Sequence, residues 1–400
     1  MFGTPASKKL FSTVIVGAKR TPIGSFMGSI KELSAPHLGT VAARAALASC
    51  ELDPKEVEEV YMGAVLQAGM GQAPARQVAL GAEMDWDTPS TTVNKVCASG
   101  MKSVMMASQA IELGQRQIML AGGMENMSKA PHYASLRKPT AYGESSMLDS
   151  IKHDGLTDAY NQILMGSCVE KVCSEMSISR EAQDEYAIES YNRARAAQEN
   201  GILDWEIIEI VQQDRKGERK FEKDEECLKF LPDKFPGLRP AFAKNGSITA
   251  ANASKINDGA AAMVLMSEQA AKDRGLKPLA RIVAYDDAAV KPIDFAIAPA
   301  KAVEKLLKRA NMEMSDIEYH EVNEAFSAVA LANMKLLDLD PSRVNVHGGA
   351  VALGHPIGCS GTRILLSLLN VLRTKDATMG MASICNGGGG ASAVILERLN

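Results

Sequence analysis

Short apolar runs and longer helical segments alternate along most of the chain. The run TVIVGAKRTPIG (13–24) predicts a strand, and PHLGTVAARAALASCELDPKEVEEVYMG (36–63) predicts a helix, a turn and the start of a second strand. Strands that alternate with helices of this length are typical of βαβ units. The pattern therefore predicts an α/β protein whose sheet is rich in parallel strands.

The same order of elements returns in the second half of the chain. ARIVAYDDAAV (280–290) precedes a helix, a turn and a strand start at 299–326. Residues 97–128 and residues 359–392 both contain a turn of small residues, a helix, a polar break, an apolar strand and glycines. We therefore predict a duplicated α/β core, although any α/β protein has some similarities of this kind.

The middle of the chain follows a different pattern. SISREAQDEYAIESYNRARAAQENG (177–201) predicts a helix that is capped by Ser179 and ends at Gly201. The charged, proline-bearing stretch 214–240 predicts a surface loop. We therefore predict an N-terminal half made of residues 9–125 and 251–270, an inserted loop domain at 126–250 and a C-terminal half at 271–400.

Size and charge narrow the possible functions. The 400 residues exceed the roughly 250–300 residues that one hydrophobic core usually supports, so at least two lobes are expected. The chain is 46% hydrophobic and 23% charged, as in an ordinary globular protein. A net charge of −4 argues against a nucleic-acid partner, so an anionic ligand would need a local basic patch.

Cysteine usage and the apolar segments bear on the compartment. The seven cysteines have no disulfide-framework spacing, which predicts free thiols in a reducing environment. No apolar stretch of signal-peptide length precedes the first predicted strand, so we expect no secretion. The uncharged segment 377–396 is long enough to span a bilayer, but its run of four glycines favours two buried strands around a tight turn over a membrane helix.

Cys97 is the first candidate for chemistry. It ends a β-type run in STTVNKVCASGMKSVMMAS (90–108), and a helix is predicted to begin just after it. The positive end of a helix dipole favours a thiolate, which is nucleophilic. A buried structural cysteine is the alternative, and the sequence leaves it open.

Two polar positions in the last third could assist such a thiol. His355 lies in the glycine-dense segment NVHGGAVALGHPIGCSG (345–361), where a rigid turn could hold a base beside a thiol. Asn323 follows a predicted strand in HEVNEAF (320–326), where it could hold a water or a carbonyl. The alternative for His355 is a core histidine whose hydrogen bonds are only structural, and the alternative for Asn323 is a helix cap.

The segment MASICNGGGGASAVIL (381–396) places Cys385 before four glycines. Glycines let the backbone approach a substrate and direct N–H groups at a developing negative oxygen, as an oxyanion hole requires. A phosphate loop is the competing interpretation, but no Gly-Lys-Ser/Thr follows. Equivalent strand ends of the repeat would bring Cys97, His355 and Cys385 to one side of the fold.

Four segments together resemble the catalytic blocks of the thiolase family, in the family's order: NKVCASGMKS, NEAF, GGAVALGHPIGCSG and CNGGGGAS. Other stretches, including RTPIGSFMGS, GQAPARQ and PIDFAIAP, resemble the acetoacetyl-CoA thiolases, most of all the mitochondrial type. The resemblance covers essentially the whole chain. It implies two βαβαβαββ halves layered as α/β/α/β/α, with an inserted loop domain.

The resemblance also implies an activity and the residues that perform it. The expected enzyme is an acyltransferase that condenses two acetyl-CoA to acetoacetyl-CoA plus CoA, and runs the reverse thiolysis, through an acyl-cysteine. Cys97 would be the acylated nucleophile, His355 its base and Cys385 the second acid/base. Asn323 would fix a water that stabilises the enolate oxygen together with His355. The N–H groups of Cys97 and Gly387 would hold the acyl-enzyme oxyanion.

Binding residues follow from the same resemblance. Ser254 matches a pantetheine contact, Met165 is retained near the acyl group, and Tyr191 is expected near the substrate. Lys229 and Lys234 belong to a basic run, 227–244, that could meet the CoA phosphates, although a solvated surface explains these charges nearly as well. CoA is then a substrate and no cofactor is required. Potassium activation is expected at five positions: Tyr191, Ala250, Ala251, Ala253 and Val351.

The chain departs from the family pattern at two places. Leu164 stands where short-chain members usually carry histidine, and Val169, Glu170 and Lys171 stand where they carry Ala-Glu-Asn. The substrate range, including tolerance of 2-methylacetoacetyl-CoA, therefore stays open.

The resemblance also implies an oligomeric state and a location in the cell. Residues 130–143 resemble the loop that joins thiolase dimers into tetramers, which implies a homotetramer. A mitochondrial matrix location, with roles in fatty acid, ketone body and isoleucine metabolism, is implied as well. No transit peptide is visible, so the cytosol remains open.

Other functions compete with this interpretation. A ketoacyl synthase shares the fold, but that class normally replaces the second cysteine with histidine, and Cys385 argues against it. A non-catalytic carrier of CoA esters or lipids would not need all four reactive positions. Metal binding by Cys168 and Cys173 is disfavoured because no histidine lies nearby in the sequence. We expect neither a nucleic-acid nor a membrane partner.

Overall fold

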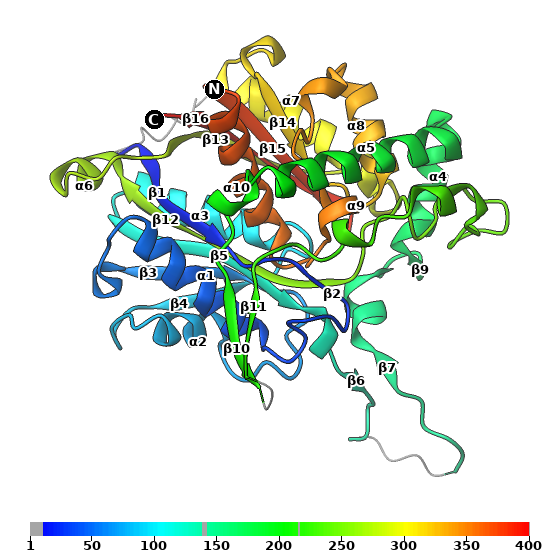
Figure 1. The fold of residues 1–400 in the computed structure, drawn as a ribbon, viewed down its shortest axis with the longest axis horizontal. Helices are drawn as coiled ribbons and strands as arrows, with labels where there is room; N and C mark the ends of the chain where they lie inside the picture. Colours follow the sequence, from blue (N-terminus) through cyan, green and yellow to red (C-terminus); the bar gives the residue numbers. More distant parts are fainter. Residues whose placement is uncertain (1–10, 138–141, 215–216, 400) are drawn as a thin grey trace, which may run out of the picture.

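The computed structural model describes residues 11–137, 142–214 and 217–399. Its centre is one large mixed sheet in the order β14-β15-β16-β13-β1-β12-β5-β3-β4, with the short β2 (Gly24–Ser25) paired to β12 (Figure 1). The strands of the first half are β1 (Thr13–Arg20), β3 (Glu59–Gly63), β4 (Ser90–Val93), β5 (Ile118–Asn126) and β12 (Asn257–Ser267). Those of the second half are β13 (Ala280–Ala289), β14 (Tyr319–Val322), β15 (Met379–Asn386) and β16 (Gly390–Arg398).

The strand order confirms the duplication. The order β1-β12-β5-β3 in one half is repeated as β13-β16-β15-β14 in the other. The halves meet where β1 pairs with β13 through Val14↔Arg281 and Ile15↔Ala280. Among the strands of the described residues, parallel pairing is limited to β3 with β4, β3 with β5, and β14 with β15. The expectation of a sheet rich in parallel strands was therefore wrong, because β12 and β16 each run antiparallel between two neighbours.

Helices cover both faces of the sheet in the expected layers. On the first half, α1 (Ala35–Ser49) and α2 (Pro74–Gly81) pack together over the strands. On the second half, α7 (Ala298–Ala310) packs on β13 and β16. Between the halves, α3 (Ser99–Glu112) packs against its counterpart α10 (Ser360–Thr374), and both contact strands of the sheet. α3 and α10 thus lie between the two halves of the sheet, so the layers run α/β/α/β/α and the predicted fold class is confirmed.

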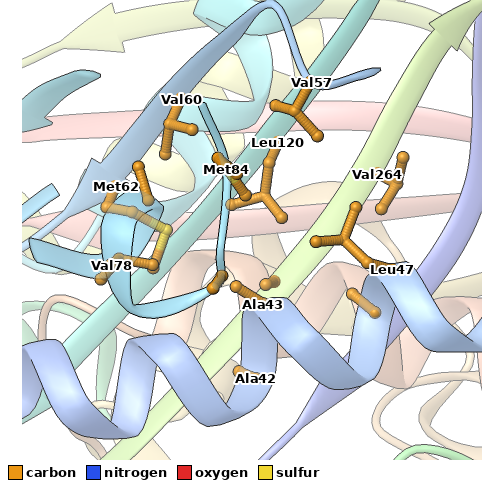
Figure 2. Close-up of a cluster of buried hydrophobic side chains, with 14 of the residues drawn as sticks. Ala42, Ala43, Leu47, Val57, Val60, Met62, Val78, Met84, Leu120 and Val264 are labelled. Carbon is orange, nitrogen blue, oxygen red and sulfur yellow. The ribbon is translucent and has the colours of Figure 1, made fainter. Parts of the chain in front are cut away.

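The outer layer of the first half illustrates how the sequence builds these contacts. Helix α1 begins where the Ser34 hydroxyl accepts the His37 N–H at 3.3 Å, and its alanines favour helix. Leu47 of this helix lies with Leu120 of β5 and Val264 of β12 in one buried cluster (Figure 2). Full burial of a leucine or valine side chain contributes about 1.5–3 kcal/mol. Packing of one apolar helix face therefore holds this layer on the sheet.

The inserted segment contributes two long helices and a hairpin. α4 spans Met165–Met176, and α5 spans Arg180–Glu199. The Ser179 hydroxyl accepts the Ala182 N–H at 3.2 Å, which confirms the predicted cap. The stretch expected to be surface loop instead includes part of a β-hairpin, β10 (Ile210–Asp214) with β11 (Gly217–Phe221).

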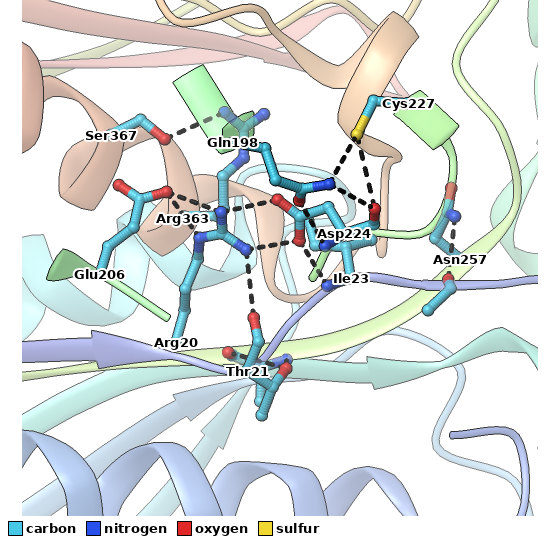
Figure 3. Close-up of polar contacts among 12 residues, drawn as sticks. Arg20, Thr21, Ile23, Gln198, Glu206, Asp224, Cys227, Asn257, Arg363 and Ser367 are labelled. Atoms are coloured by element: carbon cyan, nitrogen blue, oxygen red, sulfur yellow. Dashed lines mark hydrogen bonds and ion pairs between the residues drawn. The ribbon is translucent and has the colours of Figure 1, made fainter. Parts of the chain in front are cut away.

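A buried ion cluster ties this segment to the sheet (Figure 3). The Arg20 guanidinium at the end of β1 donates to both carboxylate oxygens of Asp224 at 2.8 Å. It also donates to Glu206 at 2.8 Å, and all three residues are fully buried. Gln198 of α5 accepts the Asp224 N–H at 2.9 Å. These paired buried charges hold the insert in a fixed position on the sheet. Side chains from the insert can therefore line a site there.

Two short strands leave the body of the molecule. β6 (His132–Tyr133) and β7 (Leu148–Asp149) pair with each other and project away from the helices and sheet (Figure 1). β6 lies within the segment 130–143 that resembles a tetramerisation loop, and β7 follows that segment. Residues 138–141 lie outside the described residues.

Candidate active site

Cys97 lies on a strained turn between β4 and α3. Val96, directly before it, has φ of 47°, a left-handed conformation that is unusual for a β-branched residue. The turn is held by the Ser99 hydroxyl, which accepts the Lys95 N–H at 2.8 Å, and by the Lys95 ammonium, which pairs with Asp287 of β13. The cysteine from the first half is therefore fixed against the second half.

The environment of Cys97 keeps its sulfur protonated in the resting site. The side chain retains partial access to a cavity, but burial still raises the pKa of the Cys97 thiol to about 12. The Gly387 N–H, directed at the thiol, opposes this rise without cancelling it. The expectation that the helix terminus favours a thiolate was therefore wrong for the resting site. A base must take the proton before the sulfur can attack.

His355, which lines the same cavity as Cys97, is the candidate for that base. It follows α9 (Ala350–Leu353) and Gly354, whose φ of 110° turns the chain, and its N–H donates to the Asn257 side chain at 3.0 Å. Its Nδ1 lies 2.6 Å from the Ser360 hydroxyl, which itself donates to the Pro356 carbonyl at 3.0 Å. Ser360 therefore accepts from His355 Nδ1–H, and the lone pair resides on Nε2.

Electrostatics keep this imidazole neutral. Burial, and then the positive charge of Arg363, lowers the pKa of His355 to about 3. An imidazole with that pKa carries no proton on Nε2 at neutral pH, so it can accept one from a thiol.

Asn323 faces the same imidazole from another strand. It follows the end of β14, and its N–H donates to the Ser383 carbonyl of β15 at 3.0 Å. Arg363 of α10 donates to the Asn323 side-chain oxygen at 3.5 Å. The Asn323 Nδ2 therefore points to His355 Nε2, also at 3.5 Å. The alternative of a helix cap was wrong, because the cap of the following helix is Phe326.

Cys385 and Gly387 come from the end of β15 and the turn after it. Cys385 is fully buried, and burial followed by the proximity of Cys97 raises the pKa of its thiol well above the usual range. Its thiol therefore carries a proton in the resting site. The turn joins β15 to β16 as predicted, with Asn386 paired to Gly390.

The glycines of this turn differ in how much room the surrounding protein leaves for a side chain. Gly388 and Gly389 have φ of 84° and 83°, and a Cβ on Gly389 would lie 2.4 Å from the Val290 carbonyl oxygen. A Cβ on Gly387 would instead lie 3.6 Å from Val96 and 3.8 Å from Met165, which is ordinary contact. The protein itself has room for a side chain at Gly387, so the space beside it is open to a ligand.

Some of these groups line one cavity of about 540 Å³, whereas Asn323 and Cys385 are not among its lining residues. Cys97, His355 and Gly387 line it together with Ser254 and Met165. Ala250 and Ala253 line it as well, so seven of the predicted residues come together there. Phe242, Phe295 and Phe326 make its walls largely apolar. Such a mixture of apolar walls and a few polar groups is typical of small-molecule sites.

Other predicted binding residues lie elsewhere. Lys229 and Lys234 are exposed and do not line this cavity, and Lys229 contacts Ser25 and Glu226 instead. Their contact with CoA phosphates stays a prediction. Lys152 and Lys255 are the lysines that do line the cavity.

The residues predicted to bind potassium do not fit that ion. Three of their backbone carbonyls, those of Ala251, Ala253 and Val351, already accept hydrogen bonds from the Lys255 ammonium. The Tyr191 ring lies beneath the same ammonium. Ala250 lines the cavity beside this group.

Sequence reasoning missed Ser360, Arg363 and Lys255. Ser360 and Arg363 stand five and eight residues after His355 in the same sequence block. Polar side chains this close to a histidine in a glycine-dense block were a usable signal. Lys255 gave no signal of its own, because its partners are backbone carbonyls.

Two further kinds of site are absent from the part of the chain that the structure describes. None of its helices is both long and apolar enough to cross a membrane. Within the same residues, no group of three or more His, Cys, Asp or Glu could hold a metal ion.

Comparisons with known proteins match the whole chain. Residues 13–269 match the family described as Thiolase, N-terminal domain, and residues 276–398 match Thiolase, C-terminal domain. The mitochondrial acetyl-CoA acetyltransferase of Xenopus tropicalis is 53% identical over 99% of this chain and 94% of its own length. That of Rattus norvegicus is 54% identical over 98% of this chain and 92% of its own.

Solved structures agree with these matches. A thiolase from Ascaris suum in complex with coenzyme A has a TM-score of 0.93 and 43% identity, covering 97% of this chain and 100% of that chain. An acetyl-CoA acetyltransferase from Bacillus anthracis has a TM-score of 0.95 and 39% identity, covering 98% of this chain and 100% of that chain.

Proposed function

Since the chain belongs to the thiolase family, we propose that it is an acetyl-CoA acetyltransferase. It condenses two acetyl-CoA to acetoacetyl-CoA and CoA, and it runs the reverse thiolysis. CoA is a substrate, and no cofactor is required. The observation that carries the proposal is the meeting of Cys97, His355 and Gly387 at one cavity, with Asn323 and Cys385 directly beside them.

The first half-reaction transfers an acetyl group to Cys97. His355 Nε2 takes the thiol proton, and the sulfur attacks the thioester carbonyl of acetyl-CoA. The N–H groups of Cys97 and Gly387 stabilise the oxyanion. When the tetrahedral intermediate collapses, the C–S bond to CoA breaks and Cys385 gives its proton to the departing sulfur. The acyl-enzyme then holds an imidazolium on His355 and a thiolate on Cys385.

The second half-reaction uses these two charges. The Cys385 thiolate removes a proton from the methyl carbon of a second acetyl-CoA. The enolate oxygen is stabilised by the His355 imidazolium and by a water held on Asn323. The enolate carbon attacks the acetyl-cysteine, the Cys97 sulfur leaves, and it recovers its proton from His355. All groups return to their resting protonation states, so no further reactant is needed.

The cavity supports a short acyl group on an extended arm. Met165 lies close to Gly387, and phenylalanines line the walls, so the acyl end is enclosed by apolar groups. The Ser254 hydroxyl donates to the Ala325 carbonyl at 2.8 Å, which fixes its oxygen at the wall of the cavity as a contact for pantetheine. Whether 2-methylacetoacetyl-CoA is accepted is to be measured alongside acetoacetyl-CoA.

Two cysteine variants test the assignment. Cys97→Ser should abolish thiolysis of acetoacetyl-CoA and leave no acetyl-enzyme after incubation with acetyl-CoA. Cys385→Ser should still acquire the mass of one acetyl group on Cys97, while thiolysis and condensation fall by about 10²–10⁴-fold. Full thiolysis by Cys97→Ser would overturn the proposal. A requirement for an acyl carrier protein in place of CoA would assign the chain to the ketoacyl synthases instead.

Assembly and location extend the same proposal. The projecting strands β6 and β7 and the segment 130–143 support a homotetramer built as a dimer of dimers, in which this segment joins the dimers. Light scattering at micromolar concentration should give the tetramer mass, and a dimer mass would contradict it. The relatives named mitochondrial support a mitochondrial location, and we propose the matrix. Fractionation of the source cells tests this.

A further inference from the structure

The Lys255 ammonium sits in a cage of backbone oxygens. It donates to the carbonyls of Ala253 at 2.9 Å, Val351 at 3.1 Å and Ala251 at 3.5 Å. Its nitrogen also lies 5.1 Å from the centre of the Tyr191 ring, within the range of a cation–π contact. A potassium ion would need these same oxygens, so it does not fit while Lys255 occupies the cage.

Two carboxylates surround this cage at longer range. Burial lowers the pKa of Lys255 to about 8, and the charges of Glu226 and Glu324 oppose that change. The ammonium form therefore prevails at neutral pH. Glu324 also accepts the Val351 N–H at 3.0 Å. Val351 is thus held at its N–H by a carboxylate and at its carbonyl by the ammonium.

The cage joins two segments that face the substrate. Ala253 and Ser254 line the cavity from the segment that precedes β12. Val351 belongs to α9, four residues before His355. A positive charge between the two segments therefore sets the position of His355 relative to the wall of the cavity that Ser254 forms.

We propose that the Lys255 side chain is a built-in replacement for a monovalent cation, which makes this enzyme independent of potassium. Lys255 is a positioning residue that acts through Ser254 and His355. The proposal rests on the proposed function for its kinetic consequence, but the cage itself does not depend on which reaction the enzyme catalyses.

The test compares wild type with Lys255→Ala and Lys255→Met at constant ionic strength, in chloride salts of potassium, ammonium or choline. Wild type should give the same kcat/KM for acetoacetyl-CoA thiolysis in all three salts. Lys255→Ala in choline should lose about ten-fold in kcat/KM, since it loses charged hydrogen bonds. Potassium or ammonium should restore most of that loss. Lys255→Met should lose a similar amount without restoration, because its side chain still fills the cage.

A binding readout accompanies the kinetics. The Tm of Lys255→Ala should rise with potassium concentration and not with choline, while the Tm of wild type should respond equally to both salts. Lys272→Ala, which removes an exposed lysine of α6 (Glu268–Asp273), is the matched control and should behave as wild type.

Two results would overturn the inference. One is an increase of more than about two-fold in the kcat/KM of wild type when potassium replaces choline. The other is a Lys255→Ala variant whose activity and Tm both ignore potassium. If the protein lacked thiolase activity while Lys255→Ala still gained Tm specifically from potassium, the proposed function would fail and the cation site would stand.

Discussion

The Gly387→Ala substitution should lower the activity of the enzyme without lowering its stability. In Gly387→Ala the new Cβ would lie 3.6 Å from Val96 and 3.8 Å from Met165, so nothing in the protein has to move. The backbone at this position is outside the left-handed region, and such a change typically stabilises a protein by about 0.4–1 kcal/mol. The free energy of unfolding should therefore be unchanged or slightly higher.

Activity should respond in the opposite direction. Gly387 lines the cavity and its N–H is directed at the Cys97 sulfur, so the added methyl group would reduce the space that the proposed function assigns to the acyl group. A misplacement of about 1 Å at a reacting centre costs on the order of 10²-fold in rate. We expect kcat/KM for acetoacetyl-CoA thiolysis to fall by about that factor.

Gly389→Ala is the matched control two residues away. Its Cβ would lie 2.4 Å from the Val290 carbonyl oxygen, on a backbone with φ of 83°. Backbone strain of this kind costs about 1–3 kcal/mol, so this variant should lose stability in urea denaturation. A Gly387→Ala variant that keeps wild-type kcat/KM, or that loses as much stability as Gly389→Ala, would contradict this prediction.

Three further predictions follow from the structure. Ser360→Ala removes the acceptor of the His355 Nδ1 proton, so kcat should fall about ten-fold, and an unchanged kcat would show that the tautomer is fixed in another way. Because burial lowers the pKa of His355 to about 3, the neutral base is present above that pH and is lost only below it; the pH profile of kcat/KM should have no acid limb near 6.5, and such a limb would contradict the neutral resting imidazole. Asp224→Asn should lower the free energy of unfolding by about 3–5 kcal/mol in urea, because the buried Arg20 loses a charged partner, and a change below 1 kcal/mol would mean that Glu206 alone compensates the charge.

Most of the fold could be predicted from local patterns. The alternation of apolar strands and capped helices predicted the repeated α/β units, and α5 begins at the Ser179 cap that the sequence indicated. The pairing directions could not be predicted in this way. A strand's periodicity is the same whether its neighbours are parallel or antiparallel, so the antiparallel placement of β12 and β16 was missed.

For the candidate site, the residues could be predicted from the sequence but their protonation states could not. Cys97, His355, Asn323 and Cys385 stand in sequence blocks dense in glycine and polar residues, and this made them visible as candidates. Their protonation states could not be predicted, because a pKa depends on how much water the surrounding chain removes and on charges that are remote in sequence. The expected thiolate at Cys97 was wrong for this reason.

The sequence by itself determined which elements form, which residue types carry the chemistry and which family they resemble, because these depend on neighbours within a few positions. Only the tertiary structure decided that Cys97 is a protonated thiol that shares a cavity with a neutral His355. It also decided that the Lys255 ammonium takes the carbonyls expected to bind potassium. Desolvation and carbonyl cages are properties of the space where distant segments meet. No single segment contains that information.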